Sequence, residues 1–253
     1  MVKKSKNTPK KEAQAKEVLE DYLSPILDVV SARFADDENV QFMTEVALSA
    51  VATLLIENVP SAVGVIFEGQ AGSNKTVVLD FLDDMKELVF KTDEWTAASW
   101  VTNVNNKSDD QKAQIHMLPK VKNKVFVTPD LAPMFAKGQH DSIKNLGQMT
   151  RIMDGEGLIR SAGTTGTVAI SGDYRFTLLG ATTPIGKTGY ISMGKVGNRF
   201  LIVDSAQYTR KVEQIVAQRS GGNIRDKKAE CKAIVKEQIQ KLWKDVGGVR
   251  KVT

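Results

Sequence analysis

Eight consecutive residues combine glycines, small side chains, a lysine and a threonine hydroxyl. They are Gly69, Gln70, Ala71, Gly72, Ser73, Asn74, Lys75 and Thr76. Small residues let backbone N–H groups curl around phosphate oxygens, and a helix that follows directs the positive end of its dipole at them. Lys75 would bridge the β- and γ-phosphates of a nucleotide, and the Thr76 hydroxyl would coordinate Mg²⁺. The alternative interpretation is a loop that leads into a helix and merely contains Gly and Lys.

The segment matches the phosphate-binding pattern G-x-x-x-x-G-K-[ST] except at the second glycine, where this chain has Asn74. Asparagine is the non-glycine residue that most readily takes a positive φ, so the departure is tolerable. Residues 62–67 form a short apolar run typical of a buried strand, and residues 75–89 have apolar positions at helical spacing. A strand, a loop and a helix in this order favour a phosphate site.

An acidic residue follows a second apolar run. Residues 124–128 (KVFVT) predict another buried strand, and Asp130 comes two residues after it. Ligands of parallel α/β sheets collect at the carboxyl ends of the strands, so Asp130 is a candidate to hold Mg²⁺ beside the phosphate loop. The alternative role is that of a turn or helix N-cap aspartate, which is the commoner role after proline.

A general base is missing from its expected place. A hydrolytic motor usually has Glu directly after the acidic residue, to orient the attacking water, whereas this chain has Leu131. Glu68, Asp93 and Glu94 are the acidic residues that could substitute, and the sequence does not choose among them. The identity of the base therefore stays open.

Two further segments place polar residues at the ends of apolar runs. Residues 175–183 predict a strand that ends in Thr182 and Thr183, and either side chain could lie between a γ-phosphate and the attacking water. Taken alone, this is only a buried strand that enters a turn. Arg199 opens a fourth apolar run, RFLIV. It could reach the γ-phosphate of a neighbouring subunit as an arginine finger, or it could be a surface salt-bridge partner.

The order and spacing of these segments are more informative than each segment alone. In them the chain resembles the AAA+ ATPases, in particular the ATPase proteins of phages and other mobile elements that are distantly similar to minichromosome-maintenance helicases. The resemblance spans roughly residues 40–203, and the segments that carry it are residues 69–76, 125–131, 178–184 and 197–201. Asn74 and Leu131 are its departures from the usual family pattern.

This resemblance implies roles for residues that are weak signals on their own. Thr182 or Thr183 would be the sensor-1 residue, and Arg199 would be the arginine finger. Arg225, which opens the last predicted helix, would be a sensor-2 residue in a reduced helical lid.

A Gly/Thr-rich stretch lies between the acidic strand and the sensor-like strand. Residues 154–170 hold two β-prone runs around it and predict a hairpin. In the resembled helicases a hairpin at this place projects into the central channel and grips DNA. Arg160 could do so here, and a simple connecting hairpin is the other interpretation.

The elements that must position these residues alternate between strands and helices. A further strand is expected at residues 97–101 and a helix at residues 142–153. Such alternation predicts an α/β fold with a mainly parallel sheet flanked by helices, which for this chain is a P-loop NTPase of AAA+-like type.

Three parts are expected along the chain. Residues 1–58 would form a basic tail and a helical N-terminal extension, with helical patterns over residues 12–35 and 40–57. Residues 59–205 would form the P-loop ATPase core. Residues 206–253 would form a short helical lid, with one helix at 207–218 and a second at 225–246.

Composition and charge exclude several classes of protein. The chain has 253 residues, and no apolar run reaches the about 18 residues that a membrane span needs. The lysine-rich start has no signal-peptide pattern, and a single Cys231 excludes a disulfide framework, so a cytoplasmic location is expected. Residues 1–16 carry a net charge of +5 and residues 208–253 carry +7, which leaves −7 for residues 17–207. Basic ends fit DNA binding, although they also serve solubility.

These observations predict an ATP-binding and ATP-hydrolysing AAA+-type protein that remodels or unwinds DNA in the replication of a mobile element. ATP and Mg²⁺ would be its cofactors and DNA its partner. If Arg199 acts on a neighbour, the chain forms a ring or helical homo-oligomer, such as a hexamer. The alternative is an ATP-controlled switch or loader that assembles on DNA with little turnover, which Leu131 and the small lid favour.

Overall fold

The computed structural model describes residues 22–35, 37–59, 62–102, 108, 111, 114–136, 138–162, 166–170, 172, 174–197, 199–205 and 223–252. Five parallel strands form its central sheet, in the order β2-β3-β6-β1-β7. Their bounds are Gly64–Glu68 (β1), Val89–Lys91 (β2), Val125–Thr128 (β3), Thr177–Thr182 (β6) and Phe200–Asp204 (β7). The predicted α/β fold with a parallel sheet flanked by helices is confirmed.

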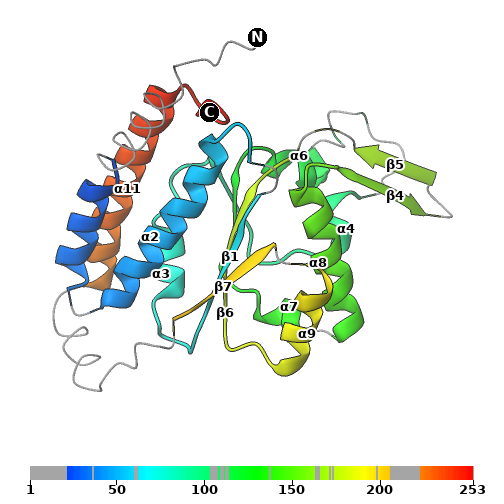
Figure 1. Cartoon of the computed structure of the whole chain (residues 1–253), viewed down its shortest axis with the longest axis horizontal. Coiled ribbons are helices and arrows are strands. Elements are labelled where there is room, and N and C mark those ends of the chain that lie inside the picture. Colours follow the sequence, from blue (N-terminus) through cyan, green and yellow to red (C-terminus); the bar gives the residue numbers. More distant parts are fainter. Residues whose placement is uncertain are drawn as a thin grey trace, which may run out of the picture.

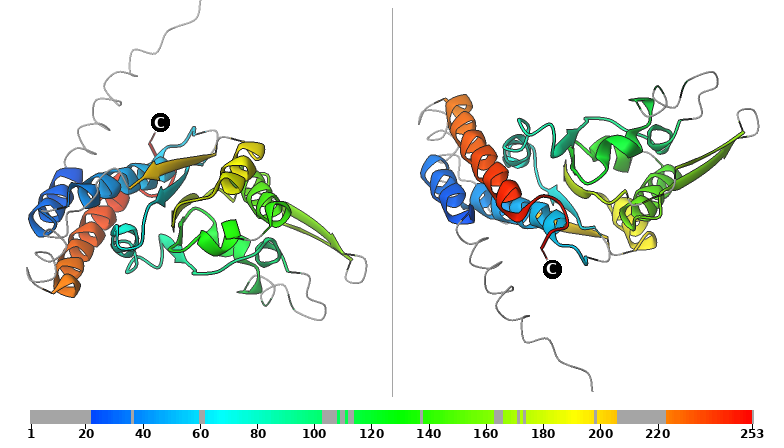
Figure 2. Two further views of the ribbon diagram at one scale, coloured as in Figure 1. Left: turned by 90° about the horizontal axis from the view of Figure 1, so that it is seen from below. Right: turned by 90° about the horizontal axis from the view of Figure 1, so that it is seen from above.

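Helices cover both faces of this sheet (Figure 1). One layer holds a helix at residues 22–33 together with α2 (Glu38–Ala52), α3 (Lys75–Asp80) and α11 (Ile224–Val246). The other layer holds α4 (Ala97–Trp100), α6 (Met117–Val121), α7 (Ala132–Ala136), α8 (Gln139–Met153) and α9 (Lys187–Lys195). Views from below and above show the sheet between the same two layers (Figure 2).

Strand residues alternate between two cores, because successive side chains on a strand point to opposite faces. On β1, Val65 and Phe67 pack into the core shared with α2, α3 and α11, whereas Ile66 packs into the core on the other side. The second core is rich in aromatic rings, and the fully buried Trp100 stacks on Phe176 with their centroids 5.7 Å apart. β1 is buried along its whole length, so the loop that follows it starts from the rigid centre of the sheet.

A two-stranded antiparallel hairpin projects from the body of the protein (Figures 1 and 2). It consists of β4 (Leu158–Ala162) and β5 (Gly166–Ile170), so the hairpin predicted within residues 154–170 is confirmed. Leu158 is buried against the aromatic core, whereas Ile159 on the other face of the hairpin is 68% exposed.

The predicted strand at residues 97–101 is wrong, because this segment forms α4. Thr96 and Ser99 each accept a hydrogen bond from the other's backbone N–H, which is a capping box that starts a helix locally. Trp100 then lies in the aromatic core. A short apolar run fits a buried helix as well as a buried strand, and here the capping pair favours the helix.

The helix predicted for residues 75–89 is shorter than expected. α3 ends at Asp80, because the N–H groups of Phe81 and Leu82 bond to carbonyls three residues back instead of four. The chain continues in turns, and β2 begins at Val89. The apolar residues of these turns are still buried in the core. Their spacing along the sequence is therefore the same as that of a longer helix, which explains the wrong prediction of its end.

The helices predicted at either side of the core correspond to α2, which continues into a short 3₁₀ turn at Thr53–Leu55, and to α11. The predicted helical segments at residues 12–21 and 207–218 lie outside the described residues. Within the described ranges, no helix is long and apolar enough to cross a membrane.

Candidate functional site

The predicted phosphate loop lies at the carboxyl edge of the sheet, between β1 and α3. Asn74, the last residue before α3, has a φ of 58° and a ψ of 13°, and Gly72 has a φ of 87°. Asn74 therefore takes the left-handed conformation that its replacement of a glycine requires. The strand, the loop and the helix have the arrangement that the motif predicts.

Lys75, the first residue of α3, is held over the loop by three hydrogen bonds. Its ammonium donates to the carbonyls of Gly69 (2.7 Å) and Gln70 (2.8 Å) and to the hydroxyl of Ser73 (2.9 Å). Burial lowers the pKa of Lys75, and attraction to the Asp130 carboxylate opposes that shift. The Lys75 ammonium thus uses its three N–H groups on acceptors of the loop itself.

Ser205, which sequence reasoning missed, ties the end of β7 to the loop. Its N–H (2.7 Å) and its hydroxyl (2.8 Å) both donate to the Glu68 carbonyl, and its hydroxyl lies 3.1 Å from the Ser73 hydroxyl. A Cβ built on Gly69 would clash with the Ser205 hydroxyl, so a larger residue here would displace that hydroxyl from its present contacts. The available signal was the location of Ser205 at the end of an apolar run, because the carboxyl ends of neighbouring parallel strands meet.

Asp130 lies two residues past β3, close enough to Lys75 for their charges to attract. Its side chain is exposed, and one carboxylate oxygen accepts a hydrogen bond from the Ala132 N–H at 2.9 Å. Asp130 therefore both stabilises the turn after β3 and lies near the loop. The hydrogen bond restrains the direction of the carboxylate.

Thr182 and Thr183 follow each other at the end of β6. The Thr182 carbonyl accepts a hydrogen bond from the Gly69 N–H (3.2 Å), and its hydroxyl donates to the Thr183 carbonyl (2.9 Å). Thr182 is buried and Thr183 is exposed. Because β6 lies between β1 and β3, the sheet brings both threonines to the same edge as Lys75 and Asp130.

The position after Asp130 belongs to the core. Leu131 is 1% exposed, and its N–H donates to the Ala181 carbonyl at 2.8 Å. Its side chain lies against Gly180 on the neighbouring strand. The position after Asp130, where a general base is expected from the sequence, is thus filled by a packed apolar side chain.

Glu68, one of the residues that could substitute as base, is engaged on both oxygens. It accepts hydrogen bonds from the Ile185 N–H (2.5 Å) and from the Tyr190 hydroxyl, and the second bond raises the pKa of Tyr190 to about 12. Glu68 therefore joins the start of the loop to α9. Asp93 and Glu94 are exposed beyond β2, and two strands separate β2 from β1.

Arg199 lies at the opposite edge of the sheet from the phosphate loop. Its carbonyl accepts a hydrogen bond from the Gly64 N–H (3.0 Å) at the start of β1, whereas the loop begins after Glu68 at the end of β1. Its Nε donates to the Asp154 carboxylate at 2.8 Å, and the Arg199 side chain is 40% exposed. The arginine is thus kept away from its own loop and holds a surface ion pair.

Arg225 lies in the first turn of α11, where its N–H donates to the side chain of the N-cap Asn223 at 3.0 Å. It lines a cavity of about 330 Å³ together with Asp80 and Asp83. These carboxylates lie at the end of α3 and just beyond it, whereas Lys75 opens α3. The structure therefore places Arg225 beside the far end of the helix and not at the phosphate loop.

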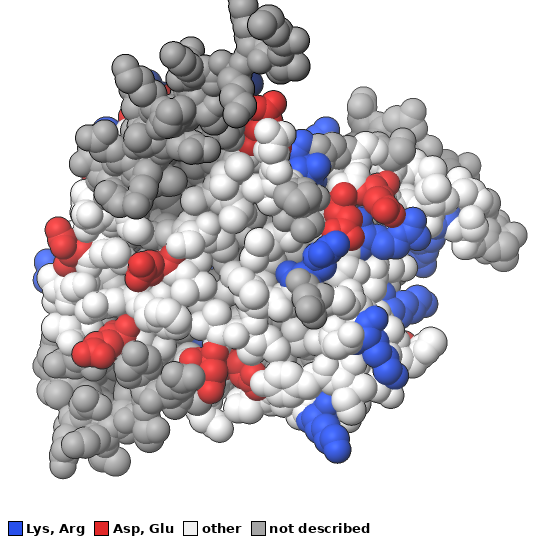
Figure 3. Space-filling view, viewed as in Figure 1, with Lys and Arg blue, Asp and Glu red and all other residues white. Residues whose placement is uncertain are grey.

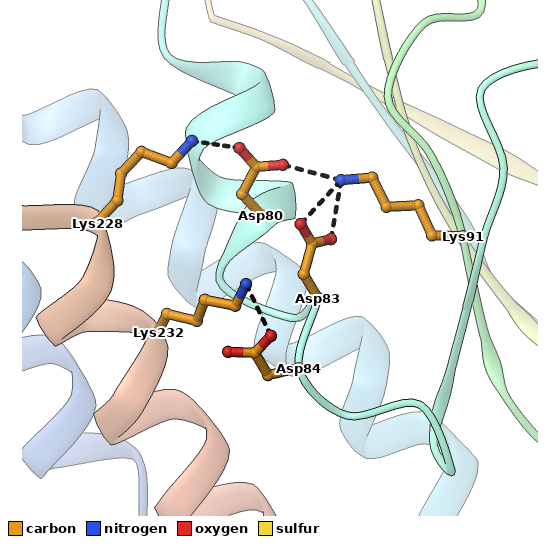
Figure 4. Close-up of polar contacts among 6 residues, drawn as sticks. All are labelled: Asp80, Asp83, Asp84, Lys91, Lys228 and Lys232. Carbon is orange, nitrogen blue, oxygen red and sulfur yellow. Dashed lines mark hydrogen bonds and ion pairs between the residues drawn. The ribbon is translucent and has the colours of Figure 1, made fainter. Parts of the chain in front are cut away.

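Salt bridges join α11 to α3 and β2 beside this cavity (Figure 4). One oxygen of Asp80 accepts a hydrogen bond from Lys228 of α11, and the other accepts one from Lys91 of β2 at 2.9 Å. Lys232, one helical turn after Lys228, pairs with Asp84 at 3.0 Å. Helix α11 is thus fastened to α3 and to the turn that follows it.

Arg160, the middle residue of β4, contacts the body of the protein. Its guanidinium donates to the carbonyls of Ala98 (3.2 Å) and Val101 (2.8 Å) at the end of α4. The contact fastens the hairpin to the body of the protein.

Folding separates the charges of the acidic middle of the chain. Figure 3 shows most Lys and Arg side chains on the half that holds α8 and α9, with a few Asp and Glu among them, and further Asp and Glu side chains on the half that holds α2. The exposed cations of α8 and α9 are Lys144, Arg151, Lys187 and Lys195. Net charge could not reveal this surface, because it sums over residues that folding places on different sides.

No protein-family model matches the chain, and no curated protein matches it. Among solved structures, the NrS-1 C-terminal region is 12% identical, with 85% of this chain and 44% of that chain covered and a TM-score of 0.33. The JCV helicase is 12% identical, with 84% and 56% covered and a TM-score of 0.39. An inhibitor-bound JCV helicase is 13% identical, with 94% and 68% covered and a TM-score of 0.40. These similarities are distant, and the chain spans about half the length of the first two structures.

Proposed function

We propose that this chain binds and hydrolyses ATP as an AAA+-type ATPase and uses the energy to remodel or unwind DNA in the replication of a mobile element. The observation that carries the proposal is the phosphate loop. Lys75 is buried and held over it by three hydrogen bonds, and Asn74 supplies the left-handed turn before α3. Asp130, Thr182 and Thr183 stand at the same edge of the sheet, where a bound nucleotide would place its phosphates.

Thr76 and Asp130 would hold Mg²⁺. A hydroxyl and a carboxylate are the oxygen ligands that this ion prefers, and Mg²⁺ is usually bound by one or two protein groups together with phosphates and water. When bound, the ion would neutralise charge on the β- and γ-phosphates.

Arg199 would act as an arginine finger on a neighbouring subunit, so the active form would be a ring or helical homo-oligomer such as a hexamer. Support comes from its place at the edge away from its own loop, where its side chain is 40% exposed. Its ion pair with Asp154 would have to open when the neighbour docks. Arg225 would serve as a sensor residue only if α11 moves along α3.

DNA is the proposed partner, bound by the basic ends of the chain and by the cations over α8 and α9 (Figure 3). Phosphate contacts from lysine and arginine supply most of the sequence-independent affinity for DNA.

A second function is an ATP-controlled switch or loader with little turnover. Two contacts favour it: Leu131 is packed against Gly180, and both oxygens of Glu68 accept hydrogen bonds. Neither residue supplies a carboxylate that is ready to orient the attacking water.

Steady-state ATPase assays with and without DNA separate the two functions, and binding of a fluorescent ATP analogue tests what they share. Binding that is lost in Lys75→Met supports the phosphate site, because methionine keeps the aliphatic stem and removes the charge. Turnover stimulated by DNA favours the motor, and binding with negligible turnover favours the switch. Equal binding by the wild type and by Lys75→Met would refute both.

A further inference from the structure

A hydrogen bond joins the phosphate loop to the segment that leads into α2. The side-chain amide of Asn74 donates to a carboxylate oxygen of Asp37 at 2.8 Å. Asp37 is 5% exposed and is the N-cap residue of α2. Its carboxylate makes no capping hydrogen bond to the α2 backbone, although aspartate at an N-cap ordinarily does so. The Asp37 side chain therefore faces the loop.

The contact explains why asparagine stands where the motif has glycine. Glycine would supply the positive φ at this position at no steric cost, but it has no side chain with which to make a contact. Asn74 supplies the same backbone conformation and adds an amide that reaches Asp37. The departure from the motif thus adds a connection that the usual residue cannot make.

A second contact links the same segment to the loop. The amide of Asn39, which is 2% exposed, donates to the Ser205 carbonyl at 3.3 Å. The Ser205 hydroxyl in turn contacts the Ser73 hydroxyl at 3.1 Å. The start of α2 therefore reaches both the last residue of the loop and the strand end that supports it.

The anchor on the other side of these contacts is rigid. α2 is 15 residues long and packs a continuous buried face into the core that it shares with β1 and α3. The buried residues of this face are Asn39, Val40, Met43, Thr44, Ala47, Ala50 and Val51. A loop residue fastened to such a helix has less freedom than one fastened only to its chain neighbours, which is the basis of pre-organised binding.

We propose that Asp37 is a positioning residue of the phosphate loop: acting through Asn74, it fixes the turn before Lys75 and couples nucleotide binding to α2. The inference rests on the proposed nucleotide site and adds to it a residue outside the motif. It assigns to the N-terminal helical extension the task of holding the loop in its binding conformation. When phosphate binds, the loop becomes less mobile, and the Asn74–Asp37 contact reduces the motion of the start of α2 as well.

Four variants test this contact. Asn74→Gly keeps the backbone conformation and removes the amide, and Asp37→Ala removes the acceptor. Asp37→Asn keeps an acceptor oxygen and removes the charge. Glu38→Ala is the matched control, because it removes one negative charge from the same helix start, at an exposed position that, within the described part of the chain, has no hydrogen bond or ion pair to the loop. Circular dichroism shows whether each variant is folded.

The measured quantity is the dissociation constant of a fluorescent ATP analogue in the presence of Mg²⁺. Asn74→Gly and Asp37→Ala should each weaken binding about tenfold, which is the loss expected for one hydrogen bond to a charged group. The double variant should bind no more weakly than the weaker of the two single variants, since both substitutions remove the Asn74–Asp37 bond. Asp37→Asn should bind within about threefold of the wild type, and Glu38→Ala should bind like the wild type.

Hydrogen exchange gives a second readout that does not depend on affinity. At saturating analogue, amides at residues 38–44 should exchange more slowly in the wild type and in Glu38→Ala, but not in Asn74→Gly. This comparison also decides the question if Asp37→Ala fails to fold.

Additive losses in the double variant, an Asp37→Asn variant as weak as Asp37→Ala, or equal protection of residues 38–44 in Asn74→Gly would overturn the inference. In each of these outcomes the nucleotide site itself survives. A wild-type chain that binds no analogue at all would instead overturn the proposed function.

Discussion

Leu131 occupies the space that a side chain on Gly180 would need, since a Cβ built on Gly180 would lie 2.5 Å from the Leu131 Cδ1 atom. The side chain of Leu131, three residues past the end of β3, therefore packs directly against the backbone of β6. The absence of a side chain at Gly180 leaves a space that the Leu131 side chain fills.

Leu131→Glu should destabilise the protein rather than restore a base. The substitution would bury a charge without a partner, which is expected to lower the free energy of unfolding by about 3 kcal/mol or more. Urea unfolding followed by circular dichroism measures the change. Leu131→Met conserves volume and should cost less than about 1.5 kcal/mol. A stable glutamate variant with faster ATP turnover would show that this position opens toward the site.

Arg199→Ala should leave ATP binding by the isolated subunit intact and lower turnover by about 10³-fold, as expected for a finger that acts on a neighbour. Mixing it with Lys75→Met should restore part of the activity, because some interfaces then pair an intact loop with an intact arginine. Steady-state turnover at several mixing ratios measures the recovery.

Asp154→Ala is the control for the ion pair, because it breaks the contact and keeps the arginine. An exposed pair of this kind contributes at most about 1 kcal/mol, so this variant should retain turnover. If Arg199→Ala and Asp154→Ala have the same small effect and the mixture of inactive chains stays inactive, Arg199 is only an ion-pair partner.

Asp80→Asn should lower the free energy of unfolding at about pH 7 by about 1–3 kcal/mol, because it removes charge-assisted hydrogen bonds from Lys228 and Lys91. Burial alone would raise the pKa of Asp80, but the hydrogen bonds from Lys228 and Lys91, together with the attraction of their charges, outweigh it and lower the pKa from its ordinary value. A lowered carboxylate pKa stabilises the fold above the unfolded value, and this contribution is lost as pH falls through the folded value. The difference between wild type and variant should therefore shrink below about pH 4.

The matched control is Asp84→Asn, which removes the neighbouring bridge from Lys232. The Asp84 side chain is 56% exposed, whereas that of Asp80 is 18% exposed, so solvent screens the control pair more strongly. It should cost less than about 1 kcal/mol, with little dependence on pH. Urea unfolding at several pH values tests both variants, and equal effects would mean that Asp80 has no special role in holding α11.

DNA binding should depend on salt through two separate surfaces. Deleting residues 2–16 removes six lysines and should make the slope of log affinity against log salt shallower, by about 0.9 for each DNA phosphate that the protein no longer neutralises. Reversing Lys187 and Lys195 to glutamate tests the surface over α9 in the same titration. An unchanged slope after the deletion would assign the tail to solubility alone.

Local chemistry made much of the site predictable. A positive φ at Asn74 follows from the residue type and its place in the motif, and the strand, loop and helix follow from hydrophobic periodicity. The secondary-structure predictions that were wrong also concerned single segments, and in them hydrogen bonds decided the structure instead of hydrophobic periodicity. The Thr96–Ser99 capping pair makes a helix of an apolar run that reads equally well as a strand.

The contacts that the sequence could not reveal join residues far apart in the chain. Ser205 meets Ser73 across 132 positions, and Asp37 meets Asn74 across 37. Each pairing depends on which strands and helices become neighbours in the fold. The type of a single polar residue does not indicate which distant segment it will contact. The order β2-β3-β6-β1-β7 had to be known before either contact could be named.

The strand β7 connects two contacts that belong to different sites. Arg199 precedes its first residue and Ser205 follows its last, and β7 runs in register with β1 over five residues, roughly 16 Å. A paired strand of this length is stiff along its axis. In the proposed oligomer, Arg199 would contact a neighbour's nucleotide and Ser205 would support the chain's own loop. The two residues would then be joined by one stiff strand. A displacement of Arg199 at one subunit interface would then move β7 as a whole. Through Ser205, the same displacement would reach the phosphate loop of the same chain, which faces the next interface.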